Sequence, residues 1–267
     1  MKIFIVATDF STAAQEAADY AAGLARTINA SVLLVHIYQA PVPIGEMPVF
    51  LIPIEDLKKT ADAGLTNAAV ALNKRFTDVV IETESRLGDI VTELDAICEE
   101  KKPVAVIAAT KQQSGIDRFL FGDTSLGLIK KIKCPVIVIP EGIVPAIPKN
   151  IAFATDLSPI EDNTISAMTE LIKLFSARLH AVHIKTEEEE EQASPNNVMH
   201  SIRNLTPTYH TVKQADITEG LQQFIFENSI DMLLVLPRRH SLMERWFTKG
   251  HTEDIVHHIS IPMLVIH

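Results

Sequence analysis

The stretch FIVATDFS at residues 4–11 returns 147 positions later as IAFATDLS at residues 151–158. Both stretches are apolar runs that end in Ala-Thr-Asp, one apolar residue and Ser. An uninterrupted apolar run is typical of a strand buried on both faces, as in a parallel sheet. We therefore predict buried strands over residues 3–7 and 151–154, each opening one of two copies of the same unit.

A helix signal follows each of these strands. In the second copy Ser158 is predicted as the N-cap, Pro159 as the first helical residue, and Glu161 as the partner in a capping box. In the first copy the N-cap is either Thr12 or Ser11. Apolar residues then recur at helical spacing in both copies, which predicts a helix packed on the sheet.

The repeat continues into a second buried strand, SVLLVHIY at 31–38 and RLHAVHIK at 178–185. His36 and His183 are again 147 positions apart, so the register of the two copies holds to this point. The closing runs PVIVIP and PMLVIH are only 127 positions apart. The second copy is therefore shorter, and most of the difference falls just after its second strand.

The remaining elements alternate between helix and strand. In the first copy we predict a helix at 54–75, a strand at 79–85, a helix at 90–100, a strand at 103–110, a helix at 124–132 and a strand at 135–140. In the second copy we predict helical residues at 193–204, a strand at 208–214, a helix at 219–228, a strand at 231–237, a helix at 252–259 and a strand at 262–267.

This alternation predicts the α/β class, with two tandem open five-stranded parallel sheets and helices on both faces. We expect domain 1 at residues 1–141, a linker at 142–149 and domain 2 at 150–267.

Composition narrows the classes of function. A formal net charge of −10 disfavours nucleic-acid binding, and no apolar run is long enough to span a bilayer. We expect no secretory signal at the N-terminus, and two cysteines favour a reducing compartment over a disulfide framework, so we expect a cytoplasmic protein. Cys134, next to Lys133, is expected to be a buried and inert thiol.

In a sheet of this kind, ligands bind beyond the carboxyl ends of the strands. Asp9 and Asp156 stand there, and two interpretations stay open. The carboxylate accepts hydrogen bonds from a ribose hydroxyl or an adenine amino group, or it tightens the turn between strand and helix. A duplication would copy an Asp of either role, so its presence in both copies does not distinguish ligand binding from turn tightening.

Several motifs in order, and twice over, resemble one known family. They are the Asp that follows strand one, the His and apolar residue that end strand two, the loop SGIDRFLFG and the ending KCPVIVIP. With these motifs the chain resembles a tandem universal stress protein over essentially its whole length. The resemblance implies an adenine nucleotide alpha hydrolase-like fold, two domains paired by their last strands, and a role in stress protection, with nucleotide binding in some members.

In nucleotide-binding members a loop reads Gly, two residues, Gly, nine residues, Gly, then Ser or Thr. In the first copy the matching positions are Ala109, Gln112, Gly122 and Asp123. Of the three glycine positions of the motif, only one holds a glycine in this chain. In addition, an ionised Asp123 repels a phosphate and cannot donate a hydrogen bond to it. We therefore expect ATP binding in domain 1 to be weak or absent.

In the second copy the matching positions are Pro237, His240, Gly250 and His251, followed by Thr252. Pro237 removes a backbone donor. Basic side chains surround this loop: Arg238, Arg239, His240, Lys249 and His251. They either hold an anion or nucleotide through side chains or form a solvated basic loop.

The predicted function is therefore a universal stress protein that acts as a non-catalytic binding or regulatory module; the alternative is slow ATP hydrolysis or phosphoryl transfer. We predict no catalytic residue and no metal ligand, and ATP or AMP is the candidate ligand. The sequence identifies no protein partner; pairing of the two domains and a further homodimer are the associations we consider. The candidate binding residues are Thr8, Asp9, Ile37, Ala109, Gly122, Thr155, Asp156, Ile184, His240, Gly250, His251 and Thr252.

Overall fold

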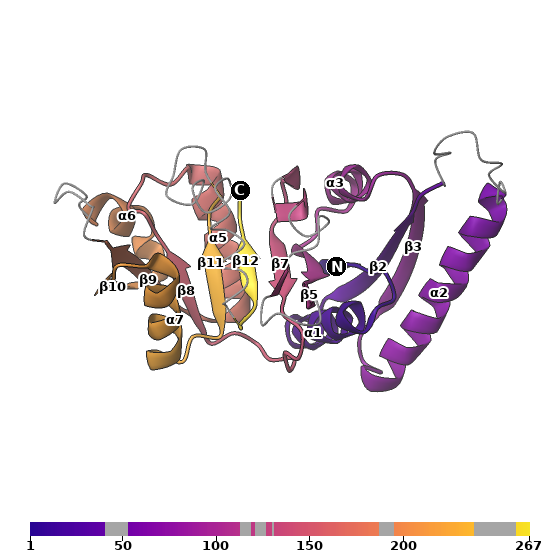
Figure 1. Ribbon diagram of the computed structural model, residues 1–267, viewed down its shortest axis with the longest axis horizontal. Helices are drawn as coiled ribbons and strands as arrows, with labels where there is room; N and C mark the ends of the chain where they lie inside the picture. Colours follow the sequence, from indigo (N-terminus) through magenta and orange to yellow (C-terminus); the bar gives the residue numbers. More distant parts are fainter. Residues whose placement is uncertain (41–52, 113–118, 121–126, 130, 187–194, 238–259) are drawn as a thin grey trace.

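One mixed ten-stranded sheet runs through the whole molecule (Figure 1). The computed structural model describes residues 1–40, 53–112, 119–120, 127–129, 131–186, 195–237 and 260–267. The strand order of the ten-stranded sheet is β10-β9-β8-β11-β12-β7-β4-β1-β2-β3. The order is symmetric about the centre, because each half places its first strand between its second strand and the strand that precedes its last.

The first half contains these elements: β1 (Ile3–Ala7), α1 (Thr12–Ile28), β2 (Ser31–Tyr38), α2 (Ile54–Arg75), β3 (Ile81–Leu87), α3 (Ile90–Lys101), β4 (Ala105–Ala109) and β7 (Val136–Ile139). A separate two-stranded antiparallel sheet is formed by β5 (Lys111–Gln112) and β6 (Phe119–Leu120).

The second half contains these elements: β8 (Asn150–Ala154), α5 (Asp162–Phe175), β9 (Arg178–Lys185), α6 (Asn196–Ser201), a 3₁₀ helix η1 (Arg203–Leu205), β10 (Thr208–Lys213), α7 (Ile217–Glu227), β11 (Met232–Val235) and β12 (Met263–Val265).

The two halves meet through their last strands. Within each half, every strand pair of the ten-stranded sheet is parallel, whereas β7 and β12 are antiparallel, with Ile137 opposite Leu264. This pairing buries the edges of β7 and β12, and an exposed strand edge of this kind can pair with another chain and promote aggregation. The predicted fold class is confirmed, including two five-stranded parallel sheets paired by their last strands.

Helices cover both faces of the sheet, and alternate residues of a strand point into the apolar core on one face or on the other. Phe4 and Val6 point into a core with α1, α2 and α5, while Ile5 points into a core with α3 and α7. Each core contains buried residues from both halves, so the apolar layers are continuous across the junction. The long helix α2 stands beside β3 at one end of the sheet (Figure 1).

The segment between the halves packs on α1. The backbone N–H of Gly142 donates to Glu16 Oε2 at 2.7 Å, and a Cβ on Gly23 would lie 3.0 Å from Pro145 Cβ. At the start of β8, the N–H groups of Lys149 and Asn150 both donate to Asp231 Oδ2 at 2.8 Å. The exact domain boundaries stay a prediction.

The second copy's helix start was predicted wrongly. Its helix begins at Asp162 with Glu161 as the N-cap, not at Pro159 with Ser158 as the cap. The chain stays non-helical from Ser158 to Glu161, and this lets Ile160 bury its side chain in the core. In the first copy the N-cap is Ser11, whose Oγ accepts the N–H of Ala14 at 3.3 Å.

Other boundaries shifted or fall outside the described residues. β3 begins at Ile81 rather than residue 79, because the N–H of Val79 donates to Phe76 O in the turn that ends α2. The stretch predicted as helical at 193–204 divides into α6 and η1. Residues 127–129 and 131 are helical, within the predicted helix at 124–132, whereas the predicted helix at 252–259 lies outside the described residues.

No helix among the described residues is both long enough and apolar enough to cross a membrane.

Candidate functional site

The turn after β1 is built from its own side chains. Thr8 Oγ1 accepts the N–H of Phe10 at 3.1 Å, and Asp9 Oδ1 accepts the N–H of Ser11 at 3.1 Å. Phe10 has a φ of 65°, in the left-handed region that a bulky residue rarely adopts. The Thr and Asp side chains hold the backbone in this conformation and lead it into the cap of α1.

The turn after β8 repeats this geometry. Thr155 Oγ1 accepts the N–H of Leu157, and Asp156 Oδ1 accepts the N–H of Ser158, both at 3.0 Å. Leu157 has a φ of 63°. The turn-tightening role of the Asp therefore holds in both copies. Asp9 is exposed and Asp156 is half-buried at the same edge of the sheet.

A histidine on the second strand fixes each turn to the sheet. His36 Nδ1 lies 2.8 Å from Thr8 O, and His183 Nδ1 lies 3.0 Å from Thr155 O. Because a carbonyl only accepts, Nδ1 carries the proton and donates it. The repeated His spacing was visible in the sequence, but its partner was not, because the contact joins residues 28 positions apart.

Strand register brings the first-half candidates to one edge. β1 lies between β2 and β4, with Ala7 opposite Val35 and Val6 opposite Ile107. Continuing these registers by one or two residues places Thr8 and Asp9 beside the carboxyl ends of β2 and β4. Ile37 and Ala109 lie at those two ends, so the structure brings all four described candidates of the first half to this edge.

The second half gives the same edge a different lining. Thr155 and Asp156 follow β8, and Ile184 lies near the end of β9. Ile184 is only 5% exposed, and a Cβ on Gly220 of α7 would lie 2.9 Å from its Cγ2. Its side chain therefore packs against α7, whereas Ile37 is half-buried.

The rest of the predicted site is not described. Gly122, His240, Gly250, His251 and Thr252 lie outside the described residues, as does Asp123.

A cleft of about 360 Å³ lies between α1 and α2, beside the first turn. Thr8, Phe10 and Gly64 are among its lining residues. The Phe10 ring stacks on His36 with centroids 4.4 Å apart, and a Cβ on Gly64 would approach that ring to 2.7 Å. The left-handed turn thus places an aromatic ring between the cleft and the sheet edge.

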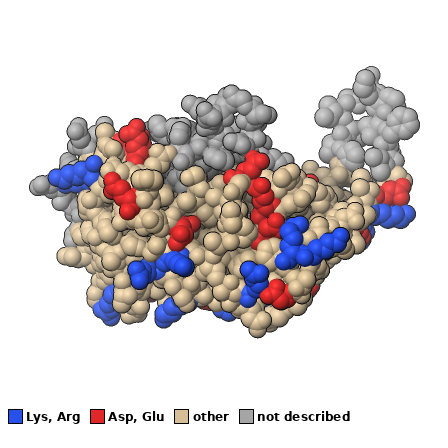
Figure 2. Space-filling view, turned by 90° about the horizontal axis from the view of Figure 1, so that it is seen from below, with Lys and Arg blue, Asp and Glu red and all other residues tan. Residues whose placement is uncertain are grey.

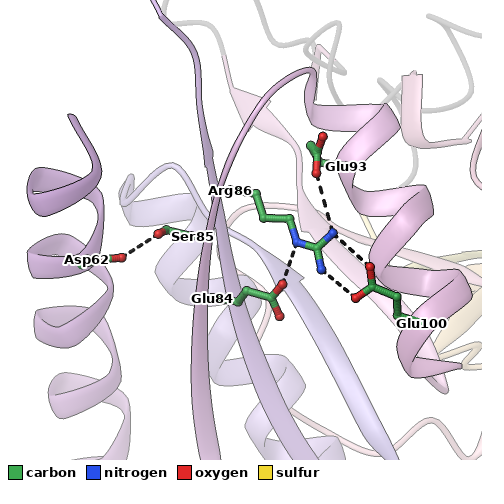
Figure 3. A network of polar contacts seen from close by, with 6 residues as sticks. All are labelled: Asp62, Glu84, Ser85, Arg86, Glu93 and Glu100. Atoms are coloured by element: carbon green, nitrogen blue, oxygen red, sulfur yellow. Dashed lines mark hydrogen bonds and ion pairs between the residues drawn. The ribbon is translucent and has the colours of Figure 1, made fainter. Parts of the chain in front are cut away.

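A polar network that the sequence did not reveal holds edge strand β3 (Figure 3). Arg86 Nε donates to Glu84 Oε1 at 2.6 Å and Arg86 Nη2 to Glu100 Oε2 at 2.7 Å, with Glu93 at 3.7 Å. The hydrogen bond to Glu100 is the main cause that raises the pKa of Arg86. Because Glu93 and Glu100 belong to α3, the network ties β3 to that helix.

On the α2 side, Ser85 Oγ donates to Asp62 Oδ1 at 2.6 Å (Figure 3). The hydrogen bond from Lys58 is the main cause that lowers the pKa of Asp62, and the bond from Ser85 adds to it. Strand β3 is therefore attached by polar contacts to the helices on both of its sides.

Basic and acidic side chains are interspersed on the face drawn in Figure 2.

Together, the parallel strands and the helices on both faces of the sheet define an α/β protein. The family model described as the Universal stress protein family matches residues 1–140. The chain therefore belongs to the universal stress protein family, and its two like halves make it a tandem member.

Similar proteins share part of its sequence or its fold. Universal stress protein MJ0531 of Methanocaldococcus jannaschii is 26% identical over 144 residues, which are 52% of this chain and 81% of that protein. A solved universal stress protein from Archaeoglobus fulgidus DSM 4304 is similar in fold, with a TM-score of 0.75, 15% identity and coverage of 99% of this chain and 97% of that one. Protein PA1789 of Pseudomonas aeruginosa PAO1, described as functionally unknown, has a TM-score of 0.61, 11% identity and coverage of 100% and 92%.

Proposed function

We propose that this protein is a non-catalytic stress-response module that binds an adenine nucleotide or a related anion at the carboxyl edge of its second half, and binds ATP weakly or not at all in its first half. We further propose a cytoplasmic location, with domain 1 at residues 1–141 and domain 2 at 150–267.

The observation that carries the proposal is the pair of equivalent turns. In each half, an oxygen of the strand-one Asp accepts a Ser N–H of its own turn at about 3 Å, at 3.1 Å for Asp9 and 3.0 Å for Asp156. A carboxylate used in this way positions the turn and presents a fixed negative edge to ribose hydroxyls or an adenine amino group. These hydrogen bonds hold the turns, and binding of a ligand by Asp9 and Asp156 is what we propose in addition.

The difference between the halves rests on charge at the phosphate loop. Asp123 places a carboxylate where the family's loop has Ser or Thr, and two like charges at about 4 Å repel by several kcal/mol near a protein surface. The second half instead carries Arg238, Arg239 and Lys249 around the corresponding loop. Basic side chains of this kind bind phosphates by charge-assisted hydrogen bonds.

The test is calorimetric titration of the full chain with ATP and with AMP, with and without Mg²⁺, alongside an assay for phosphate release. We expect binding without turnover, and we expect Asp156→Ala to weaken it. Steady phosphate release that Asp156→Ala abolishes would replace this proposal with the alternative of slow ATP hydrolysis.

A second set of titrations tests ATP binding in the first half of the chain. Asp123→Ser should raise ATP affinity by at least about tenfold, because it removes the repulsion and adds a hydroxyl donor. Asp123→Asn separates the two effects, since it removes only the charge. Asp78→Ser, in an exposed turn, is the matched control and should leave binding unchanged. Unaltered affinity in both Asp123 variants would contradict the assignment of that loop.

A further inference from the structure

The two cysteines, 36 positions apart in the sequence, meet in the fold. Cys98 lies on α3 and Cys134 lies two residues before β7, and their Sγ atoms are 2.7 Å apart. Both are free thiols. Cys98 is 5% exposed, whereas Cys134, expected to be buried, is half-buried.

A cleft gives solvent access to this pair. It has a volume of about 460 Å³, and both cysteines are among its lining residues. The cleft lies at the junction of the halves, because Lys2 of the first half and Glu170 of α5 also line it and form an ion pair at 3.5 Å. A small polar oxidant can therefore reach Cys134 from this side.

The surroundings hold the two thiols in place. The N–H of Lys133, next to Cys134, donates to Asp95 Oδ1 at 3.4 Å, and Lys133 Nζ contacts Glu99 Oε1 at 3.4 Å. Asp95 and Glu99 belong to α3, as Cys98 does. Lys133, directly before Cys134, is thus attached to α3 at a residue before Cys98 and at a residue after it. Bond formation needs the sulfurs to approach by less than about 1 Å.

We propose that Cys98 and Cys134 form a peroxide-oxidised dithiol site, which closes to an intramolecular disulfide when hydrogen peroxide enters the junction cleft. This role goes beyond ligand binding at the carboxyl edge and does not depend on it.

The chemistry takes two steps. In the first, the Cys134 sulfur attacks one peroxide oxygen, the O–O bond breaks, and the departing hydroxide takes the thiol proton as water, leaving a sulfenic acid. In the second, the Cys98 sulfur attacks the Cys134 sulfur, the S–S bond forms, the S–O bond breaks, and the hydroxide leaves as water with the Cys98 proton. The two sulfurs lose two electrons in total, and the peroxide gains them.

Proximity makes the second step fast relative to the first, because the two sulfurs already lie in contact. The first step is slow at neutral pH. The hydrogen bond with Cys98, and then burial, raise the pKa of the Cys134 thiol, and the thiolate is the reactive form. The rate of oxidation should therefore rise with pH.

The disulfide would close a loop over residues 99–133, which contains β4 and Gly122. Closing a loop of this length restricts the unfolded chain, so we expect the melting temperature to rise by about 5–10 °C on oxidation.

The experiment compares reduced and peroxide-treated protein by intact mass, peptide mapping and thiol titration. The expected result is loss of both thiols, a mass lower by two hydrogen atoms, a mapped Cys98–Cys134 link and a monomer on non-reducing gels. Reduction should restore the starting mass.

Cys98→Ser is the matched control, because it keeps Cys134 but removes the second nucleophile. It should accumulate a sulfenic acid that dimedone traps, whereas the wild type should not. Oxygen addition to a single cysteine of the wild type, disulfide-linked dimers, or two thiols that persist through peroxide treatment at alkaline pH would overturn the proposal.

Discussion

The two halves agree closely at the carboxyl edge and differ at the outer strands. Both halves use the same Thr and Asp side-chain bonds in the turn and the same His bond to the Thr carbonyl. Beyond the second strand, the first half has the 22-residue helix α2, whereas the second has the 6-residue α6 followed by η1. The turn at the carboxyl edge is therefore the same in both halves, while the helix that follows the second strand differs between them.

The outer strands also hold their ends by different chemistry. β3 uses Arg86 with three carboxylates, as described above (Figure 3). In β10 and β9, Thr208, His180 and His210 lie within 3.0–3.4 Å of one another beneath Phe224 of α7. The first edge therefore uses ion pairs and the second uses contacts among imidazole rings and a hydroxyl, so we expect the two halves to respond differently to salt and pH.

Removing the turn histidine should give the largest effect on stability, and a larger one in the second half. His183 is 4% exposed, so His183→Leu removes the donor to the Thr155 carbonyl where water does not replace it. This substitution should lower the free energy of unfolding by about 2–3 kcal/mol. His36→Leu should cost about 1 kcal/mol, because that site is half-buried and water replaces the bond. Urea denaturation measures both; equal losses would show that burial does not set the difference.

Breaking the β3 network should come next. Arg86→Met leaves Glu84, Glu93 and Glu100 without their shared cation and should cost about 1–2 kcal/mol, less at high salt because salt screens the carboxylates. Lys133→Met is the control, since its pair with Glu99 is exposed and should contribute at most about 0.5 kcal/mol. A similar loss in both variants, or no salt dependence, would argue against a coupled network.

The helix caps provide a matched pair with a smaller effect. Ser11→Ala removes the acceptor for the Ala14 N–H and should cost about 1 kcal/mol. Ser158→Ala, the equivalent position in the second half, should change stability by only a few tenths of a kcal/mol, because Glu161 is the cap there. Thermal unfolding of the two variants decides this. A larger loss in Ser158→Ala would mean that α5 begins where the sequence motif indicates.

The smallest expected effect is a pH response confined to the second half. Burial is the main cause that lowers the pKa of His180, and the charges of His210 and Arg178 lower it further. Because the unfolded state then binds more protons, stability should fall as the pH drops below about 6.5 toward the folded-state pKa.

Leu33 occupies the equivalent position in the first half, so His180→Leu copies that half. The difference in melting temperature between about pH 7.5 and about pH 5 should shrink in this variant. If the melting-temperature difference between the two pH values is the same in His180→Leu as in the wild type, groups other than His180 cause the pH response.

Local sequence signals predicted most of the architecture, because buried strands are continuous apolar runs and the repeat fixed their order. α2 spans residues 54–75 as predicted, and β1, β2 and β9 match their predicted bounds. The start of α5 was missed because burial of Ile160 outweighs the Ser158-Pro159 signal.

The sequence did not predict which side chains contact one another between different elements. The Cys98–Cys134 contact joins residues 36 positions apart. The Arg86 network joins the consecutive elements β3 and α3, but it depends on which face of α3 meets the strand. Neither contact has a spacing that marks it. At the candidate site, the repeat located both Asp residues, but only the structure shows that their carboxylates hold the turns.

The most direct test of the account is hydrogen exchange, followed by mass spectrometry, of the full chain with and without ATP. The two halves share one turn geometry and differ in charge where we propose a phosphate loop. ATP should therefore slow exchange in the turn at residues 155–158 and leave the turn at residues 8–11 unchanged. Protection confined to residues 8–11, or protection at neither turn under saturating ATP, would contradict it.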